Sequence, residues 1–568
     1  MRPPGGKSNQ GRAARSPGVV FAAIAAVLVV LVAAAFTPSQ PPPPPTAEFA
    51  PEAAKPIKAP PPNQTSEVGN QGATGNRGGT NGLREIRRTP PPSTQSPTPG
   101  GLTSNNVKDC VGDPPRQIED PQSPPCRAFF KGNNGGATST GVDKDTVKIV
   151  MADNQNADIT NALLTFFNNR FEFYGRHIVI ESGSCGEGSP AKLVAKADTL
   201  AQEHVFAVLG CGDVKGSAYP FFDELARKHV VSIANRADLV TEAHMAQFHP
   251  YEWTYFPTYD RAQQLLGALA CSLRAKPASH AGPAFQQMTR KFGLIYNTFT
   301  DQPDPDISAI TNTLANCGIT VEADHIVLEH SSAEQGYSQN TEQQTTTVLS
   351  KFQQDKVTTV IDLVHAVTLE QIMQVASSLN YEPEHVMSSY LYNDSELGVS
   401  GLPPDQTSHM FGESEYNPHI LPQTEYWYQA VQEGNPNFHW TDPSTYKVDA
   451  TLYLAAWYSY YPMLVLASGI QMAGADLTPE SFAKGLQNTT YPNPIVPQHP
   501  EGKVSIQPGQ HSYISDTSLV WFEPGQGDSS YADPGSFCYA DFGARFDPSD
   551  MPKTDLFYND NNCRRWGS

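Results

Sequence analysis

The amino-acid sequence predicts an α/β protein with two doubly wound parallel-sheet lobes joined by a hinge, which follow an N-terminal membrane segment and a disordered stalk. From residue 146 onward, short apolar runs rich in Val and Ile alternate with segments of helical periodicity, at intervals that suit βαβ units. The alternation occurs twice in succession. The chain of 568 residues, 39% of them hydrophobic, is long enough for several lobes with their own cores.

The first 36 residues combine a basic flank with an apolar run. Residues 1–17 contain Arg2, Lys7, Arg12 and Arg15 and no acid, and residues 18–36 carry no charge. Because charges are costly inside a bilayer, this pattern predicts either a transmembrane anchor or a cleaved signal peptide. The positive-inside rule keeps residues 1–17 in the cytoplasm and the rest outside it. We expect a single-pass protein of the cell membrane, or a secreted one if the segment is cleaved.

A polar linker and a cap segment follow. Residues 37–105 are rich in Pro, Gly, Ser and Thr, and are predicted to be disordered because they cannot bury enough apolar area to offset their ordering entropy. Residues 106–145 form a disulfide-containing cap segment. An even number of cysteines in an exported chain predicts disulfides, and sequential pairing is the simplest of several schemes. The cysteines are Cys110, Cys126, Cys185, Cys211, Cys271, Cys317, Cys538 and Cys563.

The elements of the two lobes are predicted from their periodicity. In the first lobe, strands are expected at residues 147–151, 175–181, 205–209 and 230–234, with helices at 159–173, 191–203 and 217–228. In the second, helices are expected at 260–273, 307–315, 341–354 and 369–379, with strands at 291–296, 320–328, 358–363, 386–391, 502–506 and 517–522. We assign residues 146–258 and 395–490 to lobe 1, 259–394 and 491–522 to lobe 2, and 523–568 to a disulfide-pinned tail.

An aromatic, apolar stretch lies at residues 446–473. It contains Lys447 and Asp449 and is interrupted by Pro462, Ser468 and Gly469. These features predict a buried pair of helices in a globular lobe, with the aromatic side chains in the core, and not a membrane span.

Charge and missing motifs exclude several classes of function. The formal net charge of -20 argues against nucleic acid as a partner, because nucleic-acid affinity comes from basic groups that neutralise phosphates. No Gly-x-Ser-x-Gly, His-Glu-x-x-His or Gly-x-Gly-x-x-Gly motif occurs, so we expect no catalysis and no cofactor. His244 and His249 have no acidic partner at metal-ligand spacing, and no C-x-x-C exists, so no metal site is expected.

Several segments carry a resemblance to a known family. They are residues 147–151, 167–180, 205–217, 230–235, 253–257, 291–297, 316–321 and 474–480. In their order and spacing they resemble the extracellular ligand-binding receptors of the leucine/isoleucine/valine-binding protein family, with the type I periplasmic-binding fold. The loop after the first strand departs from the family pattern at residues 152–156, as do residues 171–174. The resemblance implies an ABC permease as partner and a disulfide between Cys185 and Cys211. The polar loops of the two lobes favour a small polar or zwitterionic, amino-acid-like ligand.

Ligands of open parallel sheets bind outside the carboxyl ends of the strands, where helix N-termini present free N–H groups. With two lobes facing each other, this rule predicts an interlobe cleft that closes by a hinge. The predicted ligand-binding residues are Asp153, Asn154, Gly212, Asp213, Ser217, Ala234, Asn235, Arg236, Tyr296, Thr298, Asp301, His365, Asn393 and Asp394.

Each role has a plainer alternative. Ser217 could receive a ligand carboxylate or be an ordinary N-cap, and Arg236 could hold an anion or form a surface salt bridge. Asp301 or Asp394 could meet a ligand ammonium, although a solvated loop acid is the better expectation for each.

Tyr296 and His365 could pack on the ligand or simply on the wall of the lobe. Two further functions stay open for the whole chain. The first is a receptor ectodomain without a transporter, and the second is a cell-envelope scaffold with a degenerate cleft.

Overall fold

The computed structural model describes residues 108, 110–152, 156–181, 183–185, 189–210, 219–234, 239–300, 304–328, 339–389, 393–394, 399, 401–416, 423, 425–441, 450–492, 502–524, 535–559, 561 and 563–564. The predicted membrane segment and linker lie outside these residues. Within them, no helix combines the length and apolar character that crossing a bilayer requires.

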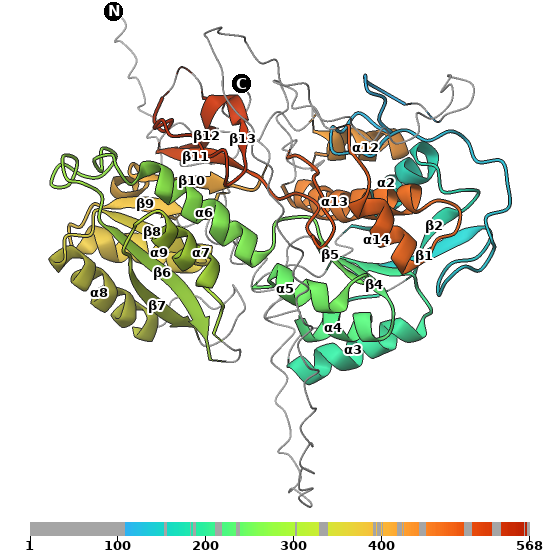
Figure 1. The fold of residues 1–568 in the computed structure, drawn as a ribbon, viewed down its shortest axis with the longest axis horizontal. Coiled ribbons are helices and arrows are strands. Elements are labelled where there is room, and N and C mark those ends of the chain that lie inside the picture. Colours follow the sequence, from blue (N-terminus) through green and yellow to red (C-terminus); the bar gives the residue numbers. More distant parts are fainter. Residues whose placement is uncertain are drawn as a thin grey trace, which may run out of the picture. The chain divides into compact units, whose positions relative to one another are not determined.

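The first sheet is parallel and covered on both faces (Figure 1). Its strands are β1 (Thr146–Met151), β2 (His177–Glu181), β3 (Ala207–Leu209), β4 (Val231–Ala234) and β5 (Glu252–Thr254), in the order β2-β1-β3-β4-β5. Helices α3 (Pro190–Gln202) and α4 (Tyr219–Arg227) pack on one face. Helices α2 (Ala157–Arg170), α12 (Tyr426–Gly434), α13 (Ala450–Ala473) and α14 (Pro479–Gln487) pack on the other. The short α5 (Glu242–Met245) lies between β4 and β5 in the chain.

The second sheet is mixed. It contains β6 (Phe292–Phe299), β7 (Glu322–Leu328), β8 (Thr359–Leu363), β9 (Glu384–Met387), β10 (Met410–Ser414), β11 (Thr517–Pro524) and β12 (Gly535–Tyr539), in the order β12-β11-β10-β9-β8-β6-β7, and β13 (Arg545–Phe546) pairs with β11. The strands from β6 to β10 run parallel, whereas β11 to β13 pair antiparallel. The predicted α/β class with two sheet lobes is confirmed, with this antiparallel edge as an addition.

Helices cover both faces of the second sheet (Figure 1). Helices α6 (Tyr259–Leu273) and α7 (Ser308–Asn316) share a core with one face, and α8 (Gln339–Gln354) and α9 (Ala366–Ser378) share a core with the other. Alternate residues of β6 show the two-residue period, because Leu294 packs with α6 while Ile295 packs on the α8 side. A short helix, α11 (Pro404–Thr407), precedes β10.

The predicted division of the chain is wrong at two places. Residues 395–490 were assigned to lobe 1, yet β10 lies within the second sheet between β9 and β11. Residues 523–568 were assigned to a tail, yet they supply β12 and β13 to the same sheet. Residues 502–506 were predicted as a strand and form only an isolated bridge between Val504 and Ile514. The sequences of β10, β12 and β13 show no clear alternation of apolar and polar residues that would have distinguished them from loops.

The predicted pair of helices at residues 446–473 is a single helix, α13, with Pro462 inside it. A proline in a helix interior costs about 3 kcal/mol. The next residues, Met463, Leu464 and Val465, are fully buried, and burying each such side chain contributes roughly 1.5–3 kcal/mol. The free energy gained by burying these side chains therefore exceeds the cost of a proline inside the helix. The expectation that aromatic residues of this stretch are core is confirmed for Tyr460 and Tyr461.

Gly469 serves close packing of α13 and α14. A Cβ at this position would lie 2.1 Å from the Phe482 ring. The glycine that suggested a helix break is therefore a contact point between two helices.

The disulfides confirm most of the sequential scheme. Cys110 pairs with Cys126, Cys271 with Cys317, and Cys538 with Cys563. Cys185 is also disulfide-bonded, and its predicted partner Cys211 lies outside the described residues.

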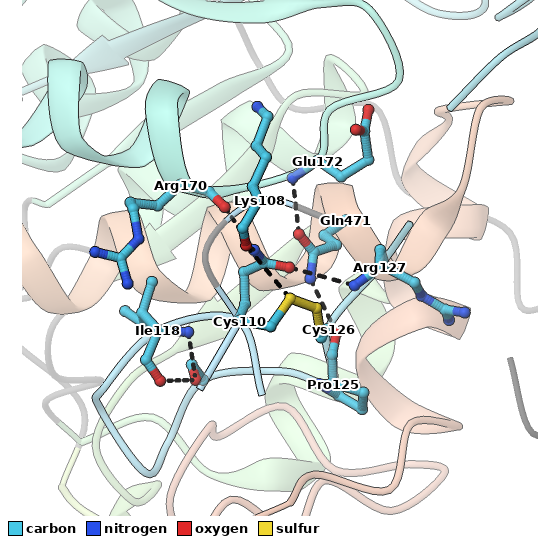
Figure 2. The surroundings of a disulfide bond; sticks show 11 residues. Lys108, Cys110, Ile118, Pro125, Cys126, Arg127, Arg170, Glu172 and Gln471 are labelled. Atoms are coloured by element: carbon cyan, nitrogen blue, oxygen red, sulfur yellow. Dashed lines mark hydrogen bonds between the residues drawn. A yellow bond between two sulfur atoms is a disulfide. The ribbon is translucent and has the colours of Figure 1, made fainter. Parts of the chain in front are cut away.

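The first disulfide closes a loop of the cap segment, and hydrogen bonds beside it join the cap to α2 and α13 (Figure 2). The Gln471 side chain donates to the Pro125 carbonyl at 3.0 Å and accepts from the Glu172 N–H at 2.8 Å. Lys108 donates to the Asn168 carbonyl at 3.1 Å at the end of α2. These contacts make the cap part of the first lobe's core.

Candidate functional site

The structure describes part of the predicted ligand-binding set. Ala234, Tyr296, Thr298, His365, Asn393 and Asp394 are described. The remaining predicted residues, Asp153, Asn154, Gly212, Asp213, Ser217, Asn235, Arg236 and Asp301, lie outside the described residues. The geometry of the candidate site therefore comes mainly from the second sheet.

His365 lies where β8 ends and α9 begins. As the N-cap residue of α9, it donates its backbone N–H to Asn297 Oδ1 at 2.9 Å. Asn297 in turn donates to Thr368 Oγ1 in the first turn of α9 at 3.1 Å. The carboxyl end of β6 and the N-terminus of α9 are thus held together by one amide side chain.

The His365 ring is 4% exposed and lies 5.7 Å from the Phe299 ring, edge to face. Burial lowers the pKa of His365 to about 3 because the charged imidazolium is poorly solvated there. The imidazole is therefore neutral at physiological pH.

Asn393 and Asp394 follow β9 and are fully buried. Asn393 donates its amide to the Val364 carbonyl at 2.7 Å, next to His365. Asp394 accepts a hydrogen bond from the Ser414 hydroxyl at the end of β10. The expectation of a solvated loop acid at Asp394 is wrong, because the segment folds inward onto strands that the prediction had placed in the other lobe.

Asn393 Oδ1 is buried, and no group of the described residues donates a hydrogen bond to it. A buried acceptor without a donor costs about 1–3 kcal/mol. Such an atom at the strand ends is available to a donor group of a ligand.

The residues at the end of β6 divide between the two faces of the sheet. Asn297 and Phe299 share the α9 face with His365, whereas Tyr296 points to the opposite face. The Tyr296 ring lies 5.7 Å from the His325 ring of β7 and packs against the α6 and α7 core. Tyr296 therefore does not lie beside His365. It packs on the wall of the lobe, which was the alternative to a contact with the ligand.

In the first sheet, Ala234 ends β4 and is 3% exposed. It lines a cavity of about 10 Å³ together with Ser232 and Glu252.

A buried polar network at Glu413 escaped the sequence prediction. Its carboxylate accepts from Ser388 Oγ at 3.0 Å and the Ser389 N–H at 3.1 Å, both just after β9. It also accepts from Thr517 Oγ1 at 2.7 Å, at the start of β11. The signal available in the sequence was an acid inside an apolar run, Phe411-Gly-Glu-Ser.

The chain passes between the sheets after β5, after β10 and before β11, and these crossings contact one another. The Thr254 N–H donates to the His511 carbonyl at 3.0 Å, and the Tyr513 and Ile514 N–H groups donate to the Thr254 and Tyr255 carbonyls at 2.8 and 3.0 Å. The crossings after β5 and before β11 are therefore paired through their backbones.

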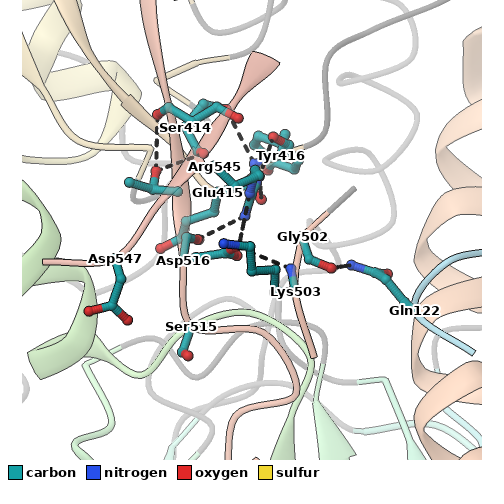
Figure 3. Close-up of polar contacts among 12 residues, drawn as sticks. Gln122, Ser414, Glu415, Tyr416, Gly502, Lys503, Ser515, Asp516, Arg545 and Asp547 are labelled. Atoms are coloured by element: carbon teal, nitrogen blue, oxygen red, sulfur yellow. Dashed lines mark hydrogen bonds and ion pairs between the residues drawn. The ribbon is translucent and has the colours of Figure 1, made fainter. Parts of the chain in front are cut away.

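Arg545 links the crossings to the C-terminal region (Figure 3). Its guanidinium donates to the Tyr416 carbonyl at 2.9 Å and to Asp516 Oδ1 at 3.0 Å, and the side chain is buried. Arg261 also reaches this region, through Ser515 O at 2.8 Å and Asp547 Oδ2 at 2.6 Å. The sequence prediction missed both arginines, since nothing local marks them.

Comparison with known proteins gives likenesses of fold. No family model matches the chain, and no curated protein matches it. The chain is similar to an ABC transporter substrate-binding protein from Aeropyrum pernix, at 12% identity over 72% of this chain and 98% of that chain, with a TM-score of 0.47. It is similar to a leucine-, isoleucine-, valine-, threonine- and alanine-binding protein from Brucella ovis, at 12% identity over 72% and 97%, with a TM-score of 0.48. It is also similar to a solute-binding protein of an ABC transporter from Rhodopseudomonas palustris in complex with 3,4-dihydroxybenzoic acid, at 12% identity over 72% and 98%, with a TM-score of 0.46.

Proposed function

We propose that this chain is an extracytoplasmic solute-binding protein that captures a small polar, amino-acid-like metabolite and delivers it to an ABC permease. The observation that carries the proposal is the convergence of Asn297, His365 and Asn393 at the carboxyl ends of β6, β8 and β9. Such strand ends are where open parallel sheets bind ligands.

The chemistry of these groups suits an uncharged or zwitterionic polar solute. Asn393 Oδ1, to which no group of the described residues donates, can accept a hydrogen bond from such a solute. The His365 ring beside it is neutral, and Asp394 adds one carboxylate. An ammonium group placed there would face a buried acid, and such charge-assisted hydrogen bonds are about twice as strong as neutral ones.

The membrane and transporter parts of the proposal rest on the sequence. Residues 18–36 would anchor the chain and residues 37–105 would form a stalk that holds the binding lobes outside the cell. A permease partner would recognise the ligand-loaded state.

A scaffold function is the second candidate, and one observation favours it. Asn393 and Asp394 are fully buried and His365 nearly so, and each also bonds within the fold. If these residues only brace the lobe, no solute will bind there.

The test is a thermal-shift screen of the full-length chain, kept in detergent with its disulfides oxidised. The panel is amino acids, short peptides, amides, sugars and purines. A ligand of the native state raises the melting temperature by several degrees well above its Kd, and calorimetry then gives the affinity. Absence of any shift across the panel would favour the scaffold.

A substitution then locates the site. Asp394→Asn should weaken a zwitterionic ligand by about tenfold or more, since it removes the charge that meets the ammonium. Asp306→Asn, at an exposed acid before α7, is the matched control and should leave affinity unchanged. Equal affinity in Asp394→Asn and the parent chain would place the ligand elsewhere.

A further inference from the structure

Three potential metal ligands meet at one edge of the first sheet. Asp223 lies on α4, His244 on α5, and Glu252 is the first residue of β5. One ligand atom from each lies within 4.8 Å of the others. His244 Nε2 is 2.8 Å from Asp223 Oδ1.

This arrangement differs from the expectation for the two neighbouring histidines. His249 faces away from His244, with its Nδ1 3.0 Å from His511 Nε2. The acids that the sequence spacing did not reveal near His244 are Asp223 and Glu252, which come from other elements.

Glu252 provides the observation that separates this cluster from an ordinary surface group of acids. The residue is only 3% exposed, and among the described residues no group bonds to its Oε1. It lines the cavity of about 10 Å³ beside Ala234, which has room for about one water molecule. A buried carboxylate with one unsatisfied oxygen is costly unless a cation or a proton compensates it.

Glu252 is buried beside Asp223, so two carboxylates lie together at this edge of the sheet. A divalent cation would give both carboxylates a partner.

We propose that Asp223, His244 and Glu252 form a binding site for a divalent transition-metal ion, of which Zn²⁺ is the best match. One imidazole and two carboxylates are ligands that Zn²⁺ accepts at about 2.0–2.2 Å, with a fourth position left for water. Ca²⁺ and Mg²⁺ prefer shells of oxygen ligands, and the imidazole disfavours them.

The surroundings of the cluster are compatible with an ion. Rings of Tyr219 and Phe248 flank the His244 imidazole at 5.0 and 5.2 Å and hold its orientation. The one described cation beside Asp223 is the Arg227 guanidinium, at 3.5 Å, and its side chain is half exposed. Arg227 also pairs with Glu224 at 3.3 Å, so it keeps a partner when an ion takes Asp223.

A bound ion would tie α4, α5 and β5 together. Glu242, the first residue of α5, bonds to His511 in the crossing before β11. The ion would therefore reduce the mobility of α4, α5 and β5, and α5 contacts the crossing before β11.

The test is isothermal titration of the full-length chain with Zn²⁺ at pH 7, without a polyhistidine tag, with disulfides oxidised and after removal of metals by chelation. We expect saturable binding of about one ion per chain. Mg²⁺ and Ca²⁺ at the same concentrations should give no comparable heat.

Variants test whether Zn²⁺ binding depends on these residues. His244→Ala and Glu252→Gln should each weaken Zn²⁺ binding by about tenfold or more. His325→Ala is the matched control, because His325 lies 3.9 Å from Asp324 on an exposed strand and belongs to no such three-residue cluster among the described residues. The control should bind as the parent chain does.

The proposal is wrong if Zn²⁺ fails to bind, or if binding persists unchanged in His244→Ala and Glu252→Gln. If Glu252→Gln does not fold, Asp223→Asn joins His244→Ala as the test, because both side chains are partly exposed. Binding that the control variant loses as well would identify scattered surface histidines and overturn the site.

Discussion

Arg290 and Glu384 meet through two parallel hydrogen bonds of 2.7 Å, Nε to Oε2 and Nη2 to Oε1, with both side chains fully buried. Glu384 also accepts from Thr359 Oγ1 at 2.7 Å. The pair fastens the start of β6 to the start of β9. Removing the Glu384 charge leaves the buried Arg290 guanidinium with only the Leu273 carbonyl at 3.1 Å and the Asp555 carboxylate at 3.9 Å. Breaking a buried ion pair in this way costs about 3–5 kcal/mol.

Glu384→Gln should therefore lower the free energy of unfolding by about 3–5 kcal/mol, measured by urea denaturation. The matched control is Lys291→Met, which removes the half-exposed pair of Lys291 with Glu322 and should cost less than about 1 kcal/mol. Similar losses in both variants would show that the buried ion pair contributes no more to the free energy of unfolding than the half-exposed pair.

Arg545→Lys should destabilise the chain although it keeps the charge. A lysine cannot reproduce the guanidinium contacts with Tyr416 O and Asp516 together. We expect a loss of about 2–4 kcal/mol in urea denaturation. Arg274→Lys, at an exposed arginine on the end of α6, should change stability by less than about 0.5 kcal/mol.

Removing the last disulfide should loosen the antiparallel edge of the second sheet. Cys538 lies in β12 and closes a loop with a sequence separation of 25 residues to Cys563. The double variant Cys538→Ala/Cys563→Ala should lose about 3 kcal/mol of stability and show faster amide exchange in β12. Exchange in the first sheet should stay as in the parent chain, and an equal increase there would contradict a local effect.

Glu252 should make stability fall as pH rises in the absence of a metal. Its pKa is about 4.5 when unfolded and about 9 when folded, so between these values the native state binds one more proton than the unfolded chain. Stability from this group is therefore complete below pH 4.5 and lost as pH approaches 9, with a slope of at most about 1.4 kcal/mol per pH unit.

Glu252→Gln should remove this contribution. In metal-free urea titrations, the free energy of unfolding of the variant should therefore rise relative to that of the parent chain between pH 6 and pH 8. The exposed Glu342→Gln on α8 serves as control. Parallel pH profiles for Glu252→Gln and the parent would show that Glu252 titrates normally.

Periodicity predicted most elements of both sheets, because Val- and Ile-rich runs and helical spacing reflect which faces are buried. It missed β10, since Glu413 interrupts the apolar run and its buried partners Ser388 and Thr517 lie far away in sequence. It also split α13 at Pro462, where tertiary burial overrides a local cost.

The sequence predicted at which strand ends the candidate site residues lie, but not which way their side chains point. The rule for parallel sheets placed His365 and Asn393 at strand ends, and in the structure Asn393 bonds to the carbonyl next to His365. It could not show that Asp394 folds inward onto Ser414 or that Tyr296 faces away, because those depend on strand pairing and on the two-residue period counted from the true strand start. The grouping of Asp223, His244 and Glu252 likewise depends on how α4, α5 and β5 pack.

The cap segment has a mechanical consequence. Gln122 accepts a hydrogen bond from Tyr255 on the crossing after β5 and, through its backbone carbonyl, one from Tyr513 on the crossing before β11. The disulfide between Cys110 and Cys126 closes the loop that carries Gln122. Breaking this disulfide would therefore loosen a side chain that both crossings contact, so reduction of one bond in the cap would affect the segments that connect the two sheets.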